Sequence, residues 1–237
     1  MEDNRYFLNQ VLQRYDPGLH ERANSFYTKV HSGGLDKEFI FAIVNAFDEN
    51  TFNTADFDAF PIEMVIDYIQ KTHRFYLQKS LPEIKQNILL LADEYPAAHP
   101  LSQSLQDFFR TYDHELKIHF ACEEKKLLPY IARLRKAETA ADQWSGFTLL
   151  NGKYSIARFL EEHDDTEAEL AVMREEILLH HPPATNTITY RALLTQLRML
   201  EKDLYVHTMM EEMVLIPKAL KIEARLAEQL RQKASLN

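Results

Sequence analysis

Apolar residues recur at alternating spacings of four and three positions through most of the chain. This pattern predicts long amphipathic helices, each with one buried face. Four such segments follow one another, from Pro61 to Asp93, Leu101 to Leu134, Tyr154 to Leu179 and Thr187 to Ile216. Only five glycines occur in the 237 residues. We therefore expect an all-α protein, with the up-down four-helix bundle as its architecture.

The chain ahead of this bundle predicts a small N-terminal helical domain. We assign residues 1–57 to that domain and residues 58–237 to the bundle with its C-terminal tail. The N-terminal helices are expected at Asn4–Tyr15, at His20–His31 and from Asp36 onward, followed by a polar linker, Glu49–Phe60. The segment holds too few apolar residues for a robust core of its own. It should therefore dock on the bundle, on another protein or on a second copy of the chain in a homodimer.

Prolines and polar stretches divide the bundle further. Pro82 lies inside the first long segment and should kink or divide it. The stretch Arg135–Lys153 is interpreted as a long connection, and the charged tail Pro217–Lys233 as one more helix.

Each of the four apolar stripes contains one histidine where packing favours a hydrophobic residue, and two stripes add a glutamate one turn later. The six positions are His73, His119, Glu123, His163, His207 and Glu211. Burying a polar group without a partner costs about 2–7 kcal/mol, and whole domains are stable by only about 5–15 kcal/mol. A bound cation would resolve this conflict, because imidazole and carboxylate groups are both metal ligands.

A duplicated motif strengthens the metal hypothesis. Residues His119 to Pro129 and His207 to Pro217 both fit the pattern H-x3-E-E-x2-L-x-P. His73 precedes the first copy by 46 residues, and His163 precedes the second by 44. Residues four apart share a helix face, so each His/Glu pair can contact the same site. Two matching halves predict two metals, with Glu123 and Glu211 bridging them and two histidines on each.

Charge and cysteine content narrow the functional classes. The formal net charge of −9 argues against a nucleic-acid-binding protein and against a polybasic membrane-binding surface. The single cysteine, Cys122, allows no intramolecular disulfide and no four-cysteine metal site. Neither a signal peptide nor a membrane-spanning segment is expected. We therefore expect a soluble, cytoplasmic protein.

These residues resemble the hemerythrin-like (HHE domain) family, whose four-helix bundles hold a non-haem di-iron centre. The resemblance covers about Pro61 to Leu220, and the overall layout looks most like the iron–sulfur-cluster repair (RIC) di-iron proteins. The segments Arg14-Tyr15-Asp16 and Glu161-Glu162-His163-Asp164 are similar to theirs. The resemblance implies two iron ions held by four His and two Glu, and a role in nitrosative or oxidative stress by iron donation or cluster repair. Damaged iron–sulfur proteins are the implied partners.

The chain departs from known members of that family in two places, and the first departure keeps an alternative function open. The repair proteins usually have a cysteine pair shortly after the position of Tyr15-Asp16, whereas this chain reads Pro17-Gly18-Leu19-His20. Oxygen-carrying hemerythrins have a second His four residues after the third-helix ligand, where this chain has Glu167, either a seventh ligand or a structural glutamate. The alternative function is an oxygen- or nitric-oxide-binding sensor or carrier without turnover. Whether the protein is an enzyme stays open.

Other polar residues near the motif are weighed as well. His114, His99, His180, His181 and Cys122 lie off the stripes and are expected not to bind metal. Glu124 and Glu212 adjoin the ligands and either orient them or are surface charges. Tyr76 and Tyr112 either hydrogen-bond near the metals or pack in the core.

Overall fold

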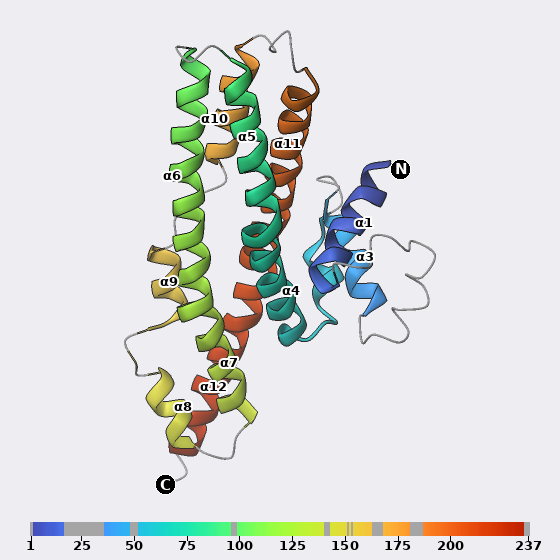
Figure 1. Ribbon diagram of the computed structural model, residues 1–237. Coiled ribbons are helices and arrows are strands. Elements are labelled where there is room, and N and C mark those ends of the chain that lie inside the picture. The colour runs from blue at the N-terminus through green and yellow to red at the C-terminus, as the bar shows by residue number, and fades with distance from the viewer. Residues whose placement is uncertain are drawn as a thin grey trace.

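A computed structural model of the chain describes residues 2–16, 36–47, 52–95, 99–139, 143–150, 152, 154–162, 168–180 and 187–234 (Figure 1). Every regular element in these ranges is helical, and none of the described residues is in a β-strand. The expected all-α class is confirmed. No described helix combines the length and the apolar character needed to cross a bilayer.

The long helices lie side by side in Figure 1. The first is α4 (Ile62–Phe75) with α5 (Leu81–Glu94), and the second is α6 (Pro100–Cys122) with α7 (Leu128–Thr139). The third contains α9 (Ile156–Glu162) and α10 (Ala168–Leu178), and the fourth is α11 (Thr187–Met210) with α12 (Ile216–Ala234). Helix α5 contacts both α6 and α11, and α10 contacts the same two helices from the other side. These are the neighbours that an up-down four-helix bundle predicts.

Three π-helical turns interrupt these rods, and each precedes a proline in the same way. The turns are η4 (Tyr76–Ser80), η5 (Glu123–Leu127) and η6 (Glu211–Leu215), and Pro82, Pro129 and Pro217 each follow two residues after a turn ends. Proline lacks an N–H and clashes with the carbonyl four residues earlier. The wider turn accommodates the ring, so the rods continue where a break was expected. Such π-bulges occur frequently at functional sites.

The structure corrects one part of the expected layout and bears out another. The stretch interpreted as a loop after Arg135 contains the end of α7 and a further helix, α8 (Gln143–Leu150), which packs on α7 and α12. The expected helix Pro217–Lys233 is present as α12, which continues directly from η6. The proline fits there because it lies in the first turn of α12, immediately after the π-turn.

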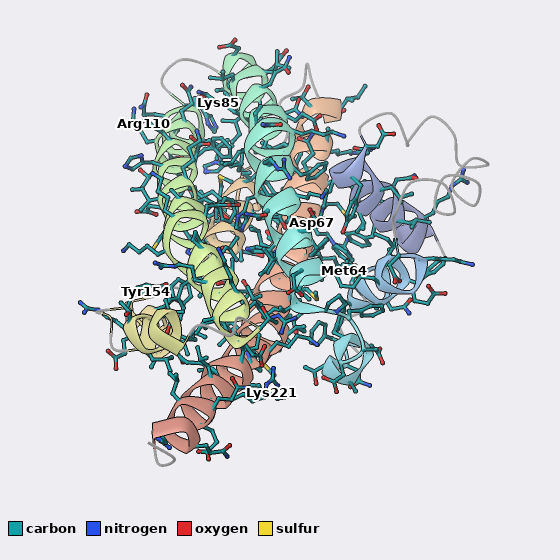
Figure 2. All side chains as sticks on the ribbon, turned by 90° about the horizontal axis from the view of Figure 1, so that it is seen from below. Met64, Asp67, Lys85, Arg110, Tyr154 and Lys221 are labelled. Carbon is teal, nitrogen blue, oxygen red and sulfur yellow. The ribbon has the colours of Figure 1, made fainter. Side chains whose placement is uncertain are left out.

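The N-terminal helices pack on one side of the bundle. Helix α1 (Glu2–Tyr15) contacts α3 (Lys37–Ala46) and α4, and the 3₁₀ turn η3 (Thr54–Phe57) contacts α3 and η6. Figure 2 looks from below and shows these elements beside Met64 and Asp67 of α4, opposite Tyr154. The expected helix His20–His31 lies outside the described residues. Docking on the chain's own bundle is therefore the arrangement observed, while the boundary at residue 57 stays a prediction.

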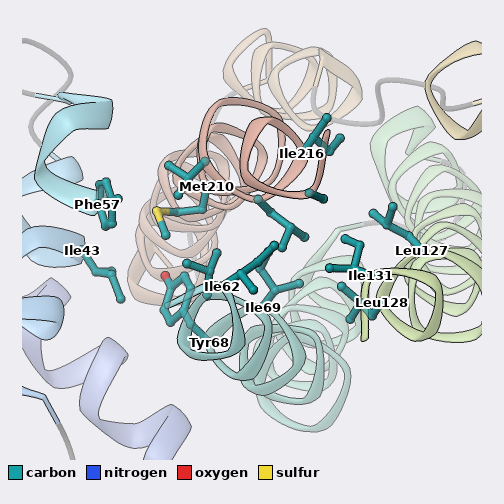
Figure 3. Close-up of a cluster of buried hydrophobic side chains, with 14 of the residues drawn as sticks. Ile43, Phe57, Ile62, Tyr68, Ile69, Leu127, Leu128, Ile131, Met210 and Ile216 are labelled. Carbon is teal, nitrogen blue, oxygen red and sulfur yellow. The ribbon is translucent and has the colours of Figure 1, made fainter. Parts of the chain in front are cut away.

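Two hydrophobic clusters fill the interior. The lower cluster joins the N-terminal elements to α4, α7, α11 and α12, and Figure 3 shows it extending from Ile43 and Phe57 through Ile62 and Met210 to Ile131. The upper cluster joins α5, α6, α10 and α11. Along α4, α6 with η5, and α11, the chain passes from one cluster to the other near the predicted ligands. The polar site therefore lies between two apolar layers.

Candidate metal centre

The boundary between the two clusters brings together five of the six predicted ligands. His73 comes from α4, His119 from the last turn of α6, and His207 from the last turn of α11. Glu123 and Glu211 are the first residues of the π-turns η5 and η6. The sixth, His163, lies outside the described residues, as does Glu167. In the sequence, His163 falls between Phe159 of the lower cluster and Leu170 of the upper cluster, as the others do.

Glu123 lies at the middle of the site and is fully buried. Its Oε1 is 2.6 Å from Nε2 of His119, and its Oε2 is 3.0 Å from Nε2 of His73. Nε2 of His207 is 4.0 Å from the same Oε2. One carboxylate therefore faces imidazoles from three different helices, with one oxygen toward each side of the site.

The donor atoms form two groups that share Glu123. His73, Glu123 and His207 make one group, and His119, Glu123 and Glu211 make the other; in each, the donor atoms lie within 4.8 Å of one another. In the first group the Nε2 atoms of His73 and His207 are 3.3 Å apart. Two imidazole nitrogens bound to one ion at about 2.1 Å and about 100° apart would be separated by about 3.2 Å. The spacing therefore fits one cation between them.

Buried polar atoms at the site still lack partners. Oε1 of Glu211 and Nδ1 of His207 are buried and have no hydrogen-bond partner among the described residues. Nε2 of His207 is 3.8 Å from Oε2 of Glu211, which is too long for a hydrogen bond. An unsatisfied buried group typically costs about 1–3 kcal/mol. His/carboxylate donor sets suit iron, manganese or zinc, so the residues present fit a metal.

The pKa values of the two buried carboxyl groups shift in opposite directions. Burial disfavours the charge on Glu123, but hydrogen bonds from His119 and His73 outweigh burial and lower its pKa. Burial, followed by the charge of Glu123, raises the pKa of Glu211 well above its usual range. Two adjacent buried carboxylates cannot both ionise without a compensating cation. A metal ion would favour the ionised form of both.

The pKa values of two of the histidines also shift in opposite directions. Burial favours neutral His73, yet hydrogen bonds to Glu123 and Glu124 outweigh burial and raise its pKa. Burial, then the nearby charge of His73, lowers the pKa of His207 to about 3. His207 is therefore neutral at pH 7, which is the form that binds a metal.

Glu124 fixes the ring of His73 from outside the ligand set. Its Oε1 is 3.0 Å from Nδ1 of His73, and Nε2 of Gln70 donates to its Oε2 at 3.1 Å. A carboxylate on the second ring nitrogen sets the tautomer and orientation of a ligating histidine. Of the two readings weighed from the sequence, the orienting one is supported for Glu124. Glu212, its counterpart in the second motif, is exposed.

A pocket of about 530 Å³ opens on the outer side of His73. Apolar and basic side chains surround its opening, among them Leu77, Phe120, Arg74, Lys117 and Lys125. Phe120 stacks on the His73 ring with centroids 4.4 Å apart. Small molecules can therefore approach the centre as far as His73 and Glu124.

The residues set aside from the ligand set lie elsewhere. His114 is exposed, and His99 caps the start of α6 by accepting from the backbone N–H of Leu101. Tyr76 is buried with its hydroxyl donated to Asp203 at 2.9 Å, not to a ligand atom. Asp203 was missed from the sequence, although it lies four residues before His207 and so shares its helix face.

No protein-family model matches the chain. Iron-sulfur cluster repair protein ScdA of Staphylococcus haemolyticus is 25% identical over 171 residues, covering 72% of this chain and 72% of that protein. The protein of the same name from Staphylococcus epidermidis is 22% identical over 189 residues, covering 79% of this chain and 80% of its own length. The chain is thus similar, at a distance, to iron–sulfur cluster repair proteins over most of its length.

Proposed function

We propose that this chain is a non-haem di-iron protein of the iron–sulfur-cluster repair type. The observation that carries the proposal is the sharing of Glu123 between two His/Glu groups, each able to hold one ion. A single-metal site would need only one of these groups. The distant similarity to repair proteins supports the same assignment.

The proposed ligand sets follow from the two groups. One iron would be held by His73 and His207, the other by His119 and Glu211, with Glu123 between them. His163 is the sixth ligand expected from the sequence, and a second bridging role for Glu211 stays a prediction. Two iron ions in this position would supply reversible one-electron redox chemistry and open coordination positions.

The surrounding residues prepare the site for this role. Glu124 and Gln70 hold the ring of His73, and the two apolar clusters keep bulk water from the carboxylates. The pocket beside His73 gives solutes an approach on one side. Carboxylate- and imidazole-bound iron of this kind can be both held and released.

The proposed role is iron donation to, or repair of, iron–sulfur proteins damaged under nitrosative or oxidative stress. The test mixes the di-ferrous protein with a cluster enzyme inactivated by nitric oxide or peroxide, with sulfide and thiol supplied. Recovery of that enzyme, beyond the recovery given by equal free ferrous iron, supports the proposal. The matched control is the His119→Ala protein, which we expect to lack the intact centre.

An oxygen- or nitric-oxide-binding function is the second candidate. The absence of cysteines after Tyr15-Asp16 favours it, because the repair proteins usually have a pair there. A binding protein without turnover should form a stable optical band with oxygen or nitric oxide. That band, together with no recovery of the damaged enzyme, would favour this candidate over repair.

A further inference from the structure

A second buried polar cluster lies beside the metal centre, and an N-terminal side chain forms it. Arg14 of α1 extends into the bundle, and its guanidinium is fully buried. Nη2 donates to both carboxylate oxygens of Asp203 at 2.5 Å. Nη1 donates to the hydroxyl of Tyr68 at 2.5 Å and to Oγ1 of Thr72 at 2.9 Å. Segments 189 residues apart in sequence are thereby joined by a buried ion pair.

Two of the three side chains that Arg14 hydrogen-bonds on the bundle are close to a proposed ligand. Asp203 lies one helical turn before His207 on α11, and Thr72 directly precedes His73 on α4. Tyr76 donates to Asp203, and its ring meets the His207 ring edge-on with centroids 6.0 Å apart.

The same tyrosine reaches the other ligand of this group through Phe120. The Tyr76 ring stacks on Phe120 at 5.7 Å, and Phe120 stacks on His73 at 4.4 Å. The cluster therefore contacts the surroundings of both His73 and His207, the two histidines of one metal group. Phe120 also meets the ring of His119 edge-on, with centroids 5.7 Å apart, whereas the hydroxyl of Tyr76 leads only to Asp203 beside His207.

Aromatic rings of α4 and the apolar packing of α1 also hold Arg14 in this position. The guanidinium carbon lies 5.2 Å from the centre of the Tyr68 ring and 5.3 Å from that of Phe75. Val11, one turn earlier on α1, is fully buried in the lower cluster. Docking of α1 thus has two separable parts, apolar packing by residues such as Val11 and a polar connection through Arg14.

We propose that Arg14 is a positioning residue of the metal centre, which sets His207 and Tyr76 through Asp203. The N-terminal helix is then part of the site's outer shell rather than a detachable recognition element. This inference rests on the proposed di-iron function, and it predicts that the disturbance is largest at His207, which lies against Tyr76 and one turn after Asp203.

The test uses the full-length, iron-loaded protein and five forms of it: wild type, Arg14→Lys, Arg14→Met, Arg14→Met with Asp203→Asn, and Val11→Ala. The first readouts are the rate of iron release to an excess of ferrous chelator and the absorption spectrum of the ferric protein. Loss of an outer-shell partner typically weakens a metal site about 10- to 100-fold. We expect iron release from Arg14→Met to rise by about that factor and the spectrum to shift.

The double variant guards against a failure to fold. Arg14→Met alone leaves Asp203 buried without a cation, whereas the added Asp203→Asn removes that charge and keeps an acceptor for Tyr76. The double variant should fold and still release iron faster than wild type. The rate of iron release from Arg14→Lys should fall between those of wild type and Arg14→Met, because one ammonium group cannot hydrogen-bond Asp203, Tyr68 and Thr72 as the guanidinium does.

Val11→Ala is the matched control for docking without the polar connection. It should lower thermal stability and leave iron release and spectrum unchanged. In the metal-free protein, the Arg14 variants should also shift the imidazole ¹⁵N resonances of His207 and leave those of exposed His114 in place.

The outcomes separate this inference from the proposed function. Suppose that wild type holds iron and both Arg14→Met forms release it at the wild-type rate with the wild-type spectrum. That result would overturn the positioning role and leave the proposed function standing. Equal acceleration by Val11→Ala would also overturn it, because docking in general would then be the cause. A wild-type protein that holds no iron would overturn the proposed function and this inference together.

Discussion

The molecule buries two polar clusters side by side, and the two differ in how their charges and hydrogen-bonding groups are paired. Around Arg14, one cation faces one carboxylate, and the oxygens of Asp203 are paired with Arg14 and Tyr76. Only Nε of Arg14 has no partner within the described part of the chain. Around Glu123, two carboxylates and three imidazoles converge, and Oε1 of Glu211 and Nδ1 of His207 have no hydrogen-bond partner among the described residues. The first cluster pairs its cation with its carboxylate, whereas the second presents donor atoms that could hold a cation.

This difference separates a structural ion pair from a binding site. Both clusters are buried, both join distant segments, and burial alone does not distinguish them. Charge balance does, because a closed pair has nothing to gain from a ligand, whereas an excess of buried carboxylates is stabilised by one. The pKa of Glu211 agrees, since burial and the charge of Glu123 raise it well above its usual range.

The largest expected effect is at the shared carboxylate. Glu123→Ala removes a donor from both groups, so metal content should fall from two ions per chain to none detectable. Metal analysis after iron loading and gel filtration measures this. His99→Ala, on a histidine remote from the centre, is the control and should retain both ions. Retention of one tightly bound ion in Glu123→Ala would mean that the two groups are independent.

The next effect concerns stability of the closed cluster. Removing one partner of a buried ion pair usually costs about 3–5 kcal/mol, whereas replacing both with apolar residues is often neutral. Arg14→Met should therefore lower the free energy of unfolding by about that amount. Arg14→Met combined with Asp203→Leu should restore most of it. Chemical denaturation of the metal-free proteins tests both, and equal losses in the single and double variants would contradict the pairing.

The open cluster should respond in the opposite direction. Glu211→Leu removes a buried carboxyl group whose Oε1 has no partner among the described residues, so the metal-free protein should gain about 1–3 kcal/mol while iron binding is lost. The gain should grow with pH. The folded protein holds the Glu211 proton more tightly than the unfolded chain does, so wild type loses stability as pH rises above about 4.3, and the variant lacks that loss. Denaturation between pH 5 and 8, compared with wild type, measures the difference. A destabilised, pH-independent variant would show Glu211 to be satisfied without metal.

The smallest expected effect is at the orienting carboxylate. Glu124→Gln weakens its hydrogen bond to His73, and we expect about a tenfold loss of iron affinity, which is about 1.4 kcal/mol. Glu212→Gln, at the exposed counterpart, should change nothing. A competition titration with a chelator of known affinity compares the two. Equal losses of iron affinity in the two variants would contradict a special orienting role for Glu124.

Much of the candidate site could be predicted from the sequence because its signal is local. Histidine and glutamate four residues apart on an apolar stripe must share a buried face, and five of the six predicted residues do converge. The predicted ends of the helices lie close to the observed ends for the same reason, because apolar periodicity and prolines are local signals. The ligand role itself, and the second bridge through Glu211, stay predictions.

The missing parts depended on contacts between distant segments. Nothing in the local sequence around Arg14 indicates that it pairs with Asp203, because an arginine on an amphipathic helix normally faces solvent. The π-turns were also missed, although the proline ending each motif was a usable signal. Pro129 and Pro217 occupy equivalent positions after Glu123 and Glu211, and Pro82 does so after Tyr76. A proline that fails to end a helix is itself an indication of a wider turn before it.

The central claim is that two ions share Glu123. The most direct test is the iron content of protein expressed under iron-replete conditions, with protein concentration from amino-acid analysis and the magnetic state from Mössbauer spectroscopy. The account predicts about two irons per chain and, in the oxidised protein, a diamagnetic ground state from coupling through the shared carboxylate. At most one iron per chain, or two that are magnetically isolated, would contradict it.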